Sequence, residues 1–185
     1  MTETRGCLLF AGGGTGGHVF PLLAVADAVS ELAPGVRVLF AGTARGLEVR
    51  AVPMRGYELE LLDVLPIRGG GVRGSIRGVG RAFASLGAAR ELVRQAKPSA
   101  VLSVGGYAAG PVSLAGVTLG VPLALLEPNS VMGLANRLVA PLARRAYTAF
   151  AEAERHFRRG RALRAGVPLR AGATQSIGEV QAVLQ

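Results

Sequence analysis

Seven short apolar runs recur along the chain, and longer segments with helical spacing of their apolar positions separate them. A strand that is apolar throughout is buried on both faces, which is typical of a parallel sheet covered by helices. The predicted strands are Cys7–Ala11, Val36–Ala41, Tyr57–Leu62, Ala100–Val104, Val121–Leu126, Ala146–Phe150 and Leu163–Val167.

Helical patterns fill the segments between these runs. The predicted helices are Val19–Leu32, Gly46–Met54, Ile76–Ala96, Pro111–Leu119, Val131–Ala140 and Glu152–Phe157. This alternation indicates an α/β fold with a doubly wound parallel sheet of the Rossmann-like kind. A chain of 185 residues can bury one such core. We therefore expect one domain over residues 1–170, followed by a tail or linker over residues 171–185.

The formal net charge of +9 calls for an anionic partner. A phosphorylated substrate, an acidic lipid surface and a nucleic acid all fit it, and a merely solvated arginine surface is the alternative. No apolar stretch reaches the ~18 uninterrupted residues that span a bilayer, so the protein is expected to be soluble or to lie on a membrane surface. The one cysteine, Cys7, lies in an apolar run and is predicted to be a buried structural thiol.

A glycine-rich loop, Ala11-Gly-Gly-Gly-Thr-Gly-Gly-His18, lies between the first predicted strand and the first predicted helix. Glycines let a backbone turn sharply and approach a ligand, and the start of a helix attracts a phosphate. Two alternatives remain, an NAD site and a tight turn without a ligand. The NAD fingerprint needs an acidic residue at the end of the second strand, but the first carboxylate there is Glu48. His18, at the mouth of the loop, is a candidate general base or a structural residue.

Four motifs in this order resemble the MurG family of glycosyltransferases. The first is Gly13-Gly-Thr-Gly-Gly-His-Val-Phe-Pro21, and the second is Gly105-Gly-Tyr-Ala-Ala-Gly-Pro111. The third is Glu127-Pro-Asn129, with Gly133 and Asn136-Arg137 after it, and the fourth is Gly166-Val-Pro-Leu-Arg170. The chain departs from the family pattern at Leu126, Pro128 and Val167, where polar side chains are usual. The resemblance covers about Leu8 to Arg170.

The resemblance implies the N-terminal half of a two-domain glycosyltransferase of the GT-B type. Such an enzyme moves N-acetylglucosamine from UDP-GlcNAc to the 4-hydroxyl of the N-acetylmuramyl group of lipid I, which gives lipid II in peptidoglycan synthesis. The N-terminal half binds lipid I, and a C-terminal half, which nothing after Arg170 resembles, binds UDP-GlcNAc. The alternative is a non-catalytic module that binds the acceptor or the membrane and needs a separate donor-binding chain.

The resemblance also implies roles for individual residues. The pyrophosphate of the acceptor would lie on Gly13, Gly14, Thr15, Gly16, Gly17, Gly105, Gly106 and Tyr107. His18 and Glu127 are the candidate catalytic residues, with His18 as the base on the 4-hydroxyl and Glu127 lining the acceptor site. Asn129 and Arg170 would face the donor cleft. The alternatives are purely structural roles: packing for Tyr107, a loop anchor for Glu127, a helix cap for Asn129 and surface charge for Arg170. No tightly bound cofactor and no metal ligand is predicted.

A basic amphipathic stretch lies between Val72 and Phe83. Its members are Val72, Arg73, Ile76, Arg77, Val79, Arg81 and Phe83. An apolar stripe flanked by cations is the pattern of a helix that lies on a membrane, although a core-facing helix shares the stripe. We predict that it docks the protein on the anionic cytoplasmic face of the bacterial plasma membrane. A nucleic acid is not predicted as a partner, because no aromatic residues are interleaved with the arginines.

Overall fold

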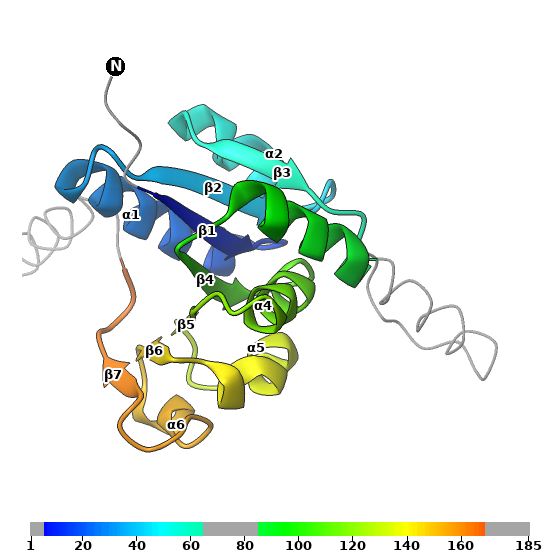
Figure 1. Ribbon diagram of the computed structural model, residues 1–185. Coiled ribbons are helices and arrows are strands. Elements are labelled where there is room, and N and C mark those ends of the chain that lie inside the picture. The colour runs from blue at the N-terminus through cyan, green and yellow to red at the C-terminus, as the bar shows by residue number, and fades with distance from the viewer. Residues whose placement is uncertain (1–5, 65–84, 169–185) are drawn as a thin grey trace, which may run out of the picture.

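A seven-stranded parallel sheet forms the centre of the molecule (Figure 1). The computed structural model describes residues 6–64 and 85–168. The strand order is β3-β2-β1-β4-β5-β6-β7, and every neighbouring pair is parallel. The strands are β1 (Cys7–Gly12), β2 (Arg37–Gly42), β3 (Glu58–Leu61), β4 (Ala100–Gly105), β5 (Leu123–Glu127), β6 (Arg145–Thr148) and β7 (Ala162–Arg164). All seven predicted strands are present, with ends that differ by up to three residues.

The helices agree with the prediction less closely than the strands. They are α1 (Gly16–Leu32), α2 (Glu48–Ala51), η1 (Pro53–Arg55), helix 85–96, α4 (Ala109–Thr118), α5 (Leu134–Val139), η2 (Ala140–Leu142) and α6 (Ala151–Glu154). The predicted helix Gly46–Met54 is wrong as one element, because Pro53 lacks the amide hydrogen that would continue α2. Only residues 85–96 of the predicted helix Ile76–Ala96 are described, and this helix ends at Lys97, which adopts a φ of 45°.

Helices cover both faces of the sheet, so the doubly wound prediction is confirmed (Figure 1). Side chains alternate along each strand, and Leu9 and Phe10 of β1 therefore belong to two different core clusters. Phe10 packs under α1, beside Leu22 and edge-on to Phe40, with 5.3 Å between the ring centroids. The cluster of Leu9 lies under helix 85–96, α4 and α5. Each fully buried Leu or Phe contributes roughly 1.5–3 kcal/mol.

The edge strand β3 is less buried than the sequence predicted. Tyr57–Leu62 was expected to be buried on both faces, but three of the four residues of β3 are exposed. Its side chains alternate between Glu and Leu, and the strand has a neighbour only in β2. Arg37 of β2 donates to Glu58 across this pair, with 3.0 Å between Nε and Oε1, and the hydrogen bond lowers the pKa of Glu58. The charged residues of the predicted strand Tyr57–Leu62 thus lie on a strand at the edge of the sheet.

Three further predictions concern the cysteine, the membrane and the segments outside the described residues. Cys7 is buried, as predicted, and burial raises the pKa of its thiol. Among the described residues, no helix combines the length and the apolar character needed to cross a bilayer. The stretch Val72–Phe83, Arg170 and the predicted tail lie outside the described residues, so their predicted roles stay predictions.

Candidate functional site

The first glycine loop joins β1 to the start of α1. Gly14 adopts a φ of +90°, which only glycine adopts readily, and Thr15 stands at the N-cap position. The side chain of Thr15 makes no capping hydrogen bond. The amide groups of Gly16 and Gly17 lie in the first helical turn, where no intrahelical acceptor exists. These donors and the positive end of a 17-residue helix make the loop a candidate anion site.

The second glycine loop joins β4 to α4 and lies directly against the first. Gly106 adopts a φ of +95°, and a Cβ atom added there would lie 2.4 Å from the carbonyl oxygen of Gly13. The strands β1 and β4 are neighbours, and Gly12 pairs with Gly105 at their carboxyl ends. Chain connections run in opposite directions from this pair of strands, and ligands of doubly wound sheets bind at such a point. The structure thus brings both predicted loops together.

His18 is half-buried in the first turn of α1, and a hydrogen bond fixes its ring. Its Nδ1 lies 3.2 Å from the carbonyl oxygen of Gly13 and 3.4 Å from Oγ1 of Thr15. Because a carbonyl oxygen can only accept, Nδ1 carries the hydrogen in this geometry, and the lone pair of a neutral ring lies on Nε2. A lone pair directed away from its own loop is what a general base requires.

Glu127, at the end of β5, is buried and fully engaged by amide donors. Its Oε1 accepts from the backbone N–H and the Nδ2 of Asn129, each at 3.0 Å. Its Oε2 accepts from Nδ2 of Asn136 at 3.0 Å, and that same amide reaches the carbonyl oxygen of Val104 at 3.1 Å. This geometry fits the loop-anchor alternative for Glu127 better than proton transfer. The alternative that Asn129 caps a helix is wrong, because α5 begins at Leu134 with Gly133 at its N-cap.

Asn136 is a site residue that the sequence analysis quoted in a motif but gave no role. It is buried on α5, and its two hydrogen bonds connect the end of β5 to the end of β4. The position lies nine residues after Glu127 and 32 residues after Val104. The motif Asn136-Arg137 marked the residue, and only the fold shows what the side chain contacts.

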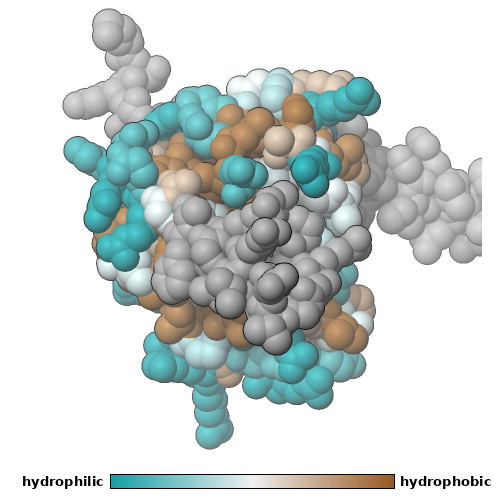
Figure 2. Space-filling model, turned by 90° about the vertical axis from the view of Figure 1, so that its right-hand side faces the viewer, coloured by the Kyte–Doolittle hydropathy of each residue, from teal (hydrophilic) through white to brown (hydrophobic). Residues whose placement is uncertain are grey.

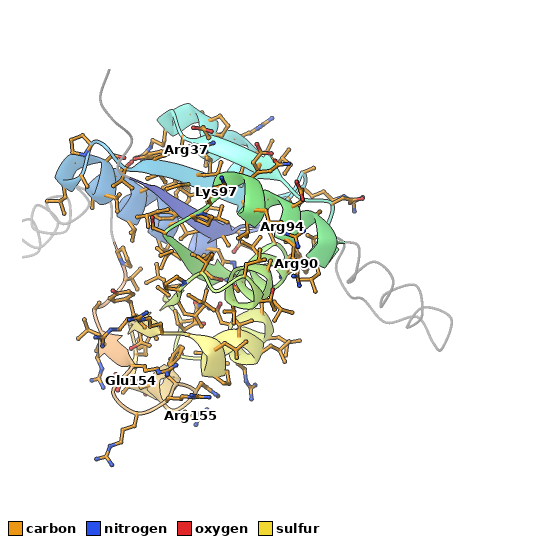
Figure 3. All side chains as sticks on the ribbon, in the orientation of Figure 1. Arg37, Arg90, Arg94, Lys97, Glu154 and Arg155 are labelled. Carbon is orange, nitrogen blue, oxygen red and sulfur yellow. The ribbon has the colours of Figure 1, made fainter. Side chains whose placement is uncertain are left out.

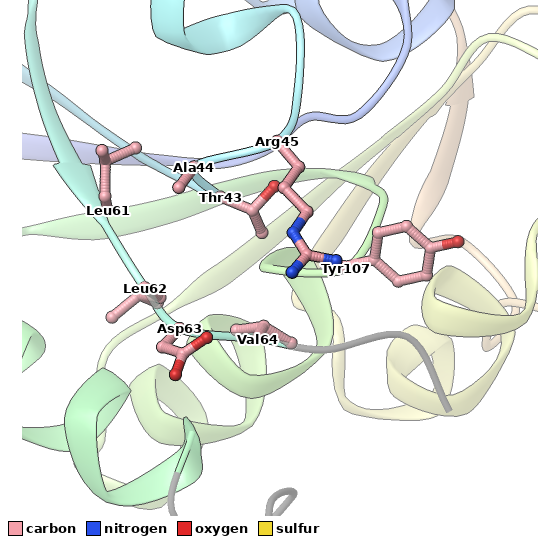
Figure 4. A pocket seen from close by; sticks show the side chains of 8 residues that line it. All are labelled: Thr43, Ala44, Arg45, Leu61, Leu62, Asp63, Val64 and Tyr107. Atoms are coloured by element: carbon pink, nitrogen blue, oxygen red, sulfur yellow. The ribbon is translucent and has the colours of Figure 1, made fainter. Parts of the chain in front are cut away.

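A pocket of about 270 Å³ lies beside the two loops, at the carboxyl ends of β2 and β3. Figure 4 shows the guanidinium group of Arg45 directed toward the ring of Tyr107, which is half exposed and follows the second glycine loop. No ion pair of Arg45 is found within residues 6–64 and 85–168. The residues that line the pocket are Thr43, Ala44, Arg45, Leu61, Leu62, Asp63, Val64 and Tyr107. The pocket therefore offers a cation and an aromatic ring to a ligand bound on the loops.

The carboxylate that follows β2 cannot hold the ribose of a dinucleotide. Glu48 is buried and accepts the backbone N–H of Gly14 at 2.8 Å, so its carboxylate faces the protein and not a ligand. The sequence argument against NAD thus gains a structural reason. In the described part of the chain, no three His, Cys, Asp or Glu side chains lie together as metal ligands would.

A parallel α/β sheet with two touching glycine loops, each opening a helix at the carboxyl ends of central strands, defines a Rossmann-like domain with a candidate phosphate site. Residues 8–148 match the glycosyltransferase family 28 N-terminal domain. The chain belongs to this family, and the resemblance to the MurG family found in the sequence is confirmed.

Two curated relatives of the chain share the name of one transferase. The chain is 57% identical over 163 residues to the UDP-N-acetylglucosamine--N-acetylmuramyl-(pentapeptide) pyrophosphoryl-undecaprenol N-acetylglucosamine transferase of Sorangium cellulosum, which covers 87% of this chain and 40% of that protein. It is 53% identical over 143 residues to the enzyme of the same name from Acidithiobacillus ferrooxidans, covering 77% of this chain and 39% of the relative. The crystal structure of Acinetobacter baumannii MurG is similar with a TM-score of 0.73 at 30% identity, over 86% of this chain and 45% of that one. The chain thus spans about 40% of the length of these curated relatives.

Proposed function

We propose that this domain binds a lipid-linked pyrophosphate acceptor, lipid I, and supplies the base for transfer of N-acetylglucosamine from UDP-GlcNAc. The observation that carries the proposal is the direct contact of the two glycine loops, since it places two helix starts around one space. A pyrophosphate has two anionic groups, and each helix start can hold one of them. The names of the relatives supply the identity of the acceptor and the donor.

In the proposed reaction, Nε2 of His18 accepts the proton of the 4-hydroxyl of the N-acetylmuramyl group. The hydroxyl oxygen forms a bond to the anomeric carbon of N-acetylglucosamine as the bond from that carbon to UDP breaks. Gly13 holds the ring of His18 through Nδ1, so the base is oriented before the substrate arrives. Glu127 and Asn136 keep the ends of β4 and β5 together behind the second loop. Asn129 and Arg170 are assigned to the donor cleft from the resemblance alone.

Binding of an acceptor analogue to the chain tests this function. We expect an N-acetylmuramyl pyrophosphate with a short lipid to shift the backbone amide signals of residues 14–17 and 105–107 in a nitrogen-15 NMR titration. N-acetylglucosamine at the same concentration should leave them unchanged, because it carries no phosphate group for the loops to bind. Shifts confined to other parts of the sheet would contradict the proposal.

We also propose that the protein is peripheral on the cytoplasmic face of the plasma membrane, because its acceptor carries a lipid. Two exposed leucines support a membrane contact in the described part of the chain. Leu134 and Leu138 of α5 are 72% and 70% exposed, lie one turn apart on the same face and flank the exposed Arg137. Figure 2 shows that hydrophobic and hydrophilic side chains lie side by side on the face seen there. Arg90 and Arg94 add cations on helix 85–96 (Figure 3).

The arginines beside the stripe Val72–Phe83 should carry most of the membrane affinity. Changing Arg73, Arg77 and Arg81 to glutamate is expected to abolish sedimentation of the chain with anionic vesicles. Each arginine near an anionic surface contributes about 1 kcal/mol, and added salt should weaken the parent in the same assay. The matched control reverses the exposed Arg144, Arg158 and Arg159 and should keep vesicle binding. A stripe variant that sediments as well as the parent would show that the stripe belongs to the core.

A further inference from the structure

Glu48 is a buried carboxylate that no step of the proposed reaction uses. Its side chain is 1% exposed, and no arginine or lysine of the described residues pairs with it. Oε1 accepts the backbone N–H of Thr43 at 2.8 Å and the hydroxyl of Thr43 at 3.1 Å. Oε2 accepts the backbone N–H of Gly14 at 2.8 Å. A buried charge is costly unless donors satisfy it, and here backbone amides from two loops do so.

Three glycines from three places in the chain leave room for this carboxylate. A Cβ atom added at Gly46 would lie 1.9 Å from Oε2 of Glu48, and one added at Gly13 would lie 2.2 Å from Oε1. At Gly42 the added atom would lie 2.5 Å from Cγ. Since any side chain at these positions would displace Glu48, the carboxylate fills a space that the glycines enclose.

The contact to Gly14 determines which amides of the first loop face outward. The N–H of Gly14 is directed inward to Glu48, and the chain then turns at a φ of +90° into Thr15 and α1. The amides of Gly16 and Gly17 remain free for an anion. Without the carboxylate, the half-buried N–H of Gly14 would lose its acceptor in the protein or would turn outward and change the loop. Glu48 lies 34 residues beyond Gly14, after β2, so it fixes the loop from outside the loop's own sequence.

We infer that Glu48 is a positioning residue for acceptor binding: it holds the first glycine loop in the conformation that presents Gly16 and Gly17 to a pyrophosphate. This inference rests on the proposed function of the loop. It assigns Glu48 no contact with substrate and no proton transfer. The role explains why a negative charge lies buried behind an anion-binding loop, since its lone pairs are occupied by the very amides that shape the loop.

The test uses Glu48→Gln, with inorganic pyrophosphate as the probe. The amide keeps the size of the side chain but turns one acceptor oxygen into a donor, so either Gly14 or Thr43 loses its partner. We expect at least tenfold weaker pyrophosphate binding in a nitrogen-15 NMR titration followed at Gly16 and Gly17. In the complete enzyme, KM for the acceptor should rise at least tenfold while KM for UDP-GlcNAc stays within twofold. Glu58→Gln, the same change in the exposed pair with Arg37, is the matched control and should leave both values unchanged.

A second variant and the unchanged protein keep the test decisive if Glu48→Gln does not fold. Gly46→Ala keeps the charge of Glu48 but displaces Oε2, and it should give the same selective rise in KM for the acceptor. In the unchanged chain, the amide hydrogen of Gly14 should exchange with solvent at least tenfold more slowly than that of Thr15. A Gly14 amide that exchanges as fast as Thr15 would overturn the inference.

The two proposals fail in different ways. If the parent binds pyrophosphate at the loop and both variants bind it equally well, the inference about Glu48 is wrong and the proposed function stands. If the parent chain itself binds no pyrophosphate, the proposed function is wrong, and the role of Glu48 falls with it. A variant that loses acceptor and donor affinity together would indicate general destabilisation and would also contradict the inference.

Discussion

Replacing His18 with alanine should lower turnover of the complete enzyme by about 10²–10⁴-fold, the usual contribution of a general base. The reason is the fixed ring, because Nδ1 is hydrogen-bonded to the carbonyl oxygen of Gly13 and the basic Nε2 faces away from the loop. The measurement is steady-state kinetics with both substrates varied. KM for UDP-GlcNAc should change little, since His18 belongs to the acceptor side.

His156→Ala is the matched control for this prediction. His156 is half-buried on the C-terminal side of α6, and the one side-chain hydrogen bond of its ring within the described residues joins it to the neighbouring Arg155. Its removal should leave turnover within twofold. If His18→Ala also keeps near-normal turnover, His18 only shapes the loop, and the base must be sought elsewhere in the enzyme.

Replacing Gly106 with alanine should lower kcat/KM for the acceptor by at least about 10²-fold, because a misplaced binding geometry can cost that much. A Cβ atom there would lie 2.4 Å from a backbone oxygen of Gly13, and a φ of +95° is strained for any L residue. The strain alone costs about 1–3 kcal/mol, which a thermal unfolding curve would detect. Kinetics at a temperature well below the midpoint separate lost binding from lost folding.

Gly87→Ala serves as the control for the glycine change. Gly87 lies in helix 85–96, and an added Cβ atom meets no other atom within 4 Å. Alanine there should raise helix stability by up to about 1 kcal/mol and leave the kinetics unchanged. Equal activity of the Gly106→Ala enzyme and the parent would show that the contact between the loops can relax without cost.

The sequence predicted the parts of the fold that depend on local pattern. The buried runs around Leu9 and Leu125 are apolar throughout, so their strands could be recognised without knowledge of their neighbours. The first glycine loop was found in the same way, because its residue types are needed locally, whereas the second was recognised only from the resemblance to the MurG family. The strand Tyr57–Leu62 was placed correctly but its burial was not, since burial depends on how many neighbours a strand has in the sheet.

The candidate site was predictable only as far as its loops and His18. In the sequence, Glu48 was noted only because it lies beyond the end of the second strand, where the NAD fingerprint needs its acidic residue. Its contact with Gly14 could not be predicted across a separation of 34 residues. Asn136 was quoted in a motif, but its hydrogen bonds to the ends of β4 and β5 depend on how α5 packs. When the partner of a side chain lies on another helix or strand, the spacing of residues along the sequence does not reveal the contact. Glu48 and Asn136 both have partners of this kind.

The backbone contact between Gly13 and Gly106 makes the two loops thermodynamically coupled. A shift of one loop toward the other brings backbone against backbone, because no side chain lies between Gly13 and Gly106 to absorb the change. A ligand group that orders one loop therefore changes the affinity of the other loop for its own ligand group. Linkage requires this effect to be reciprocal, so under the proposed function we expect the two phosphates of a pyrophosphate to bind cooperatively, and a single phosphate at either loop to gain only part of that coupling free energy.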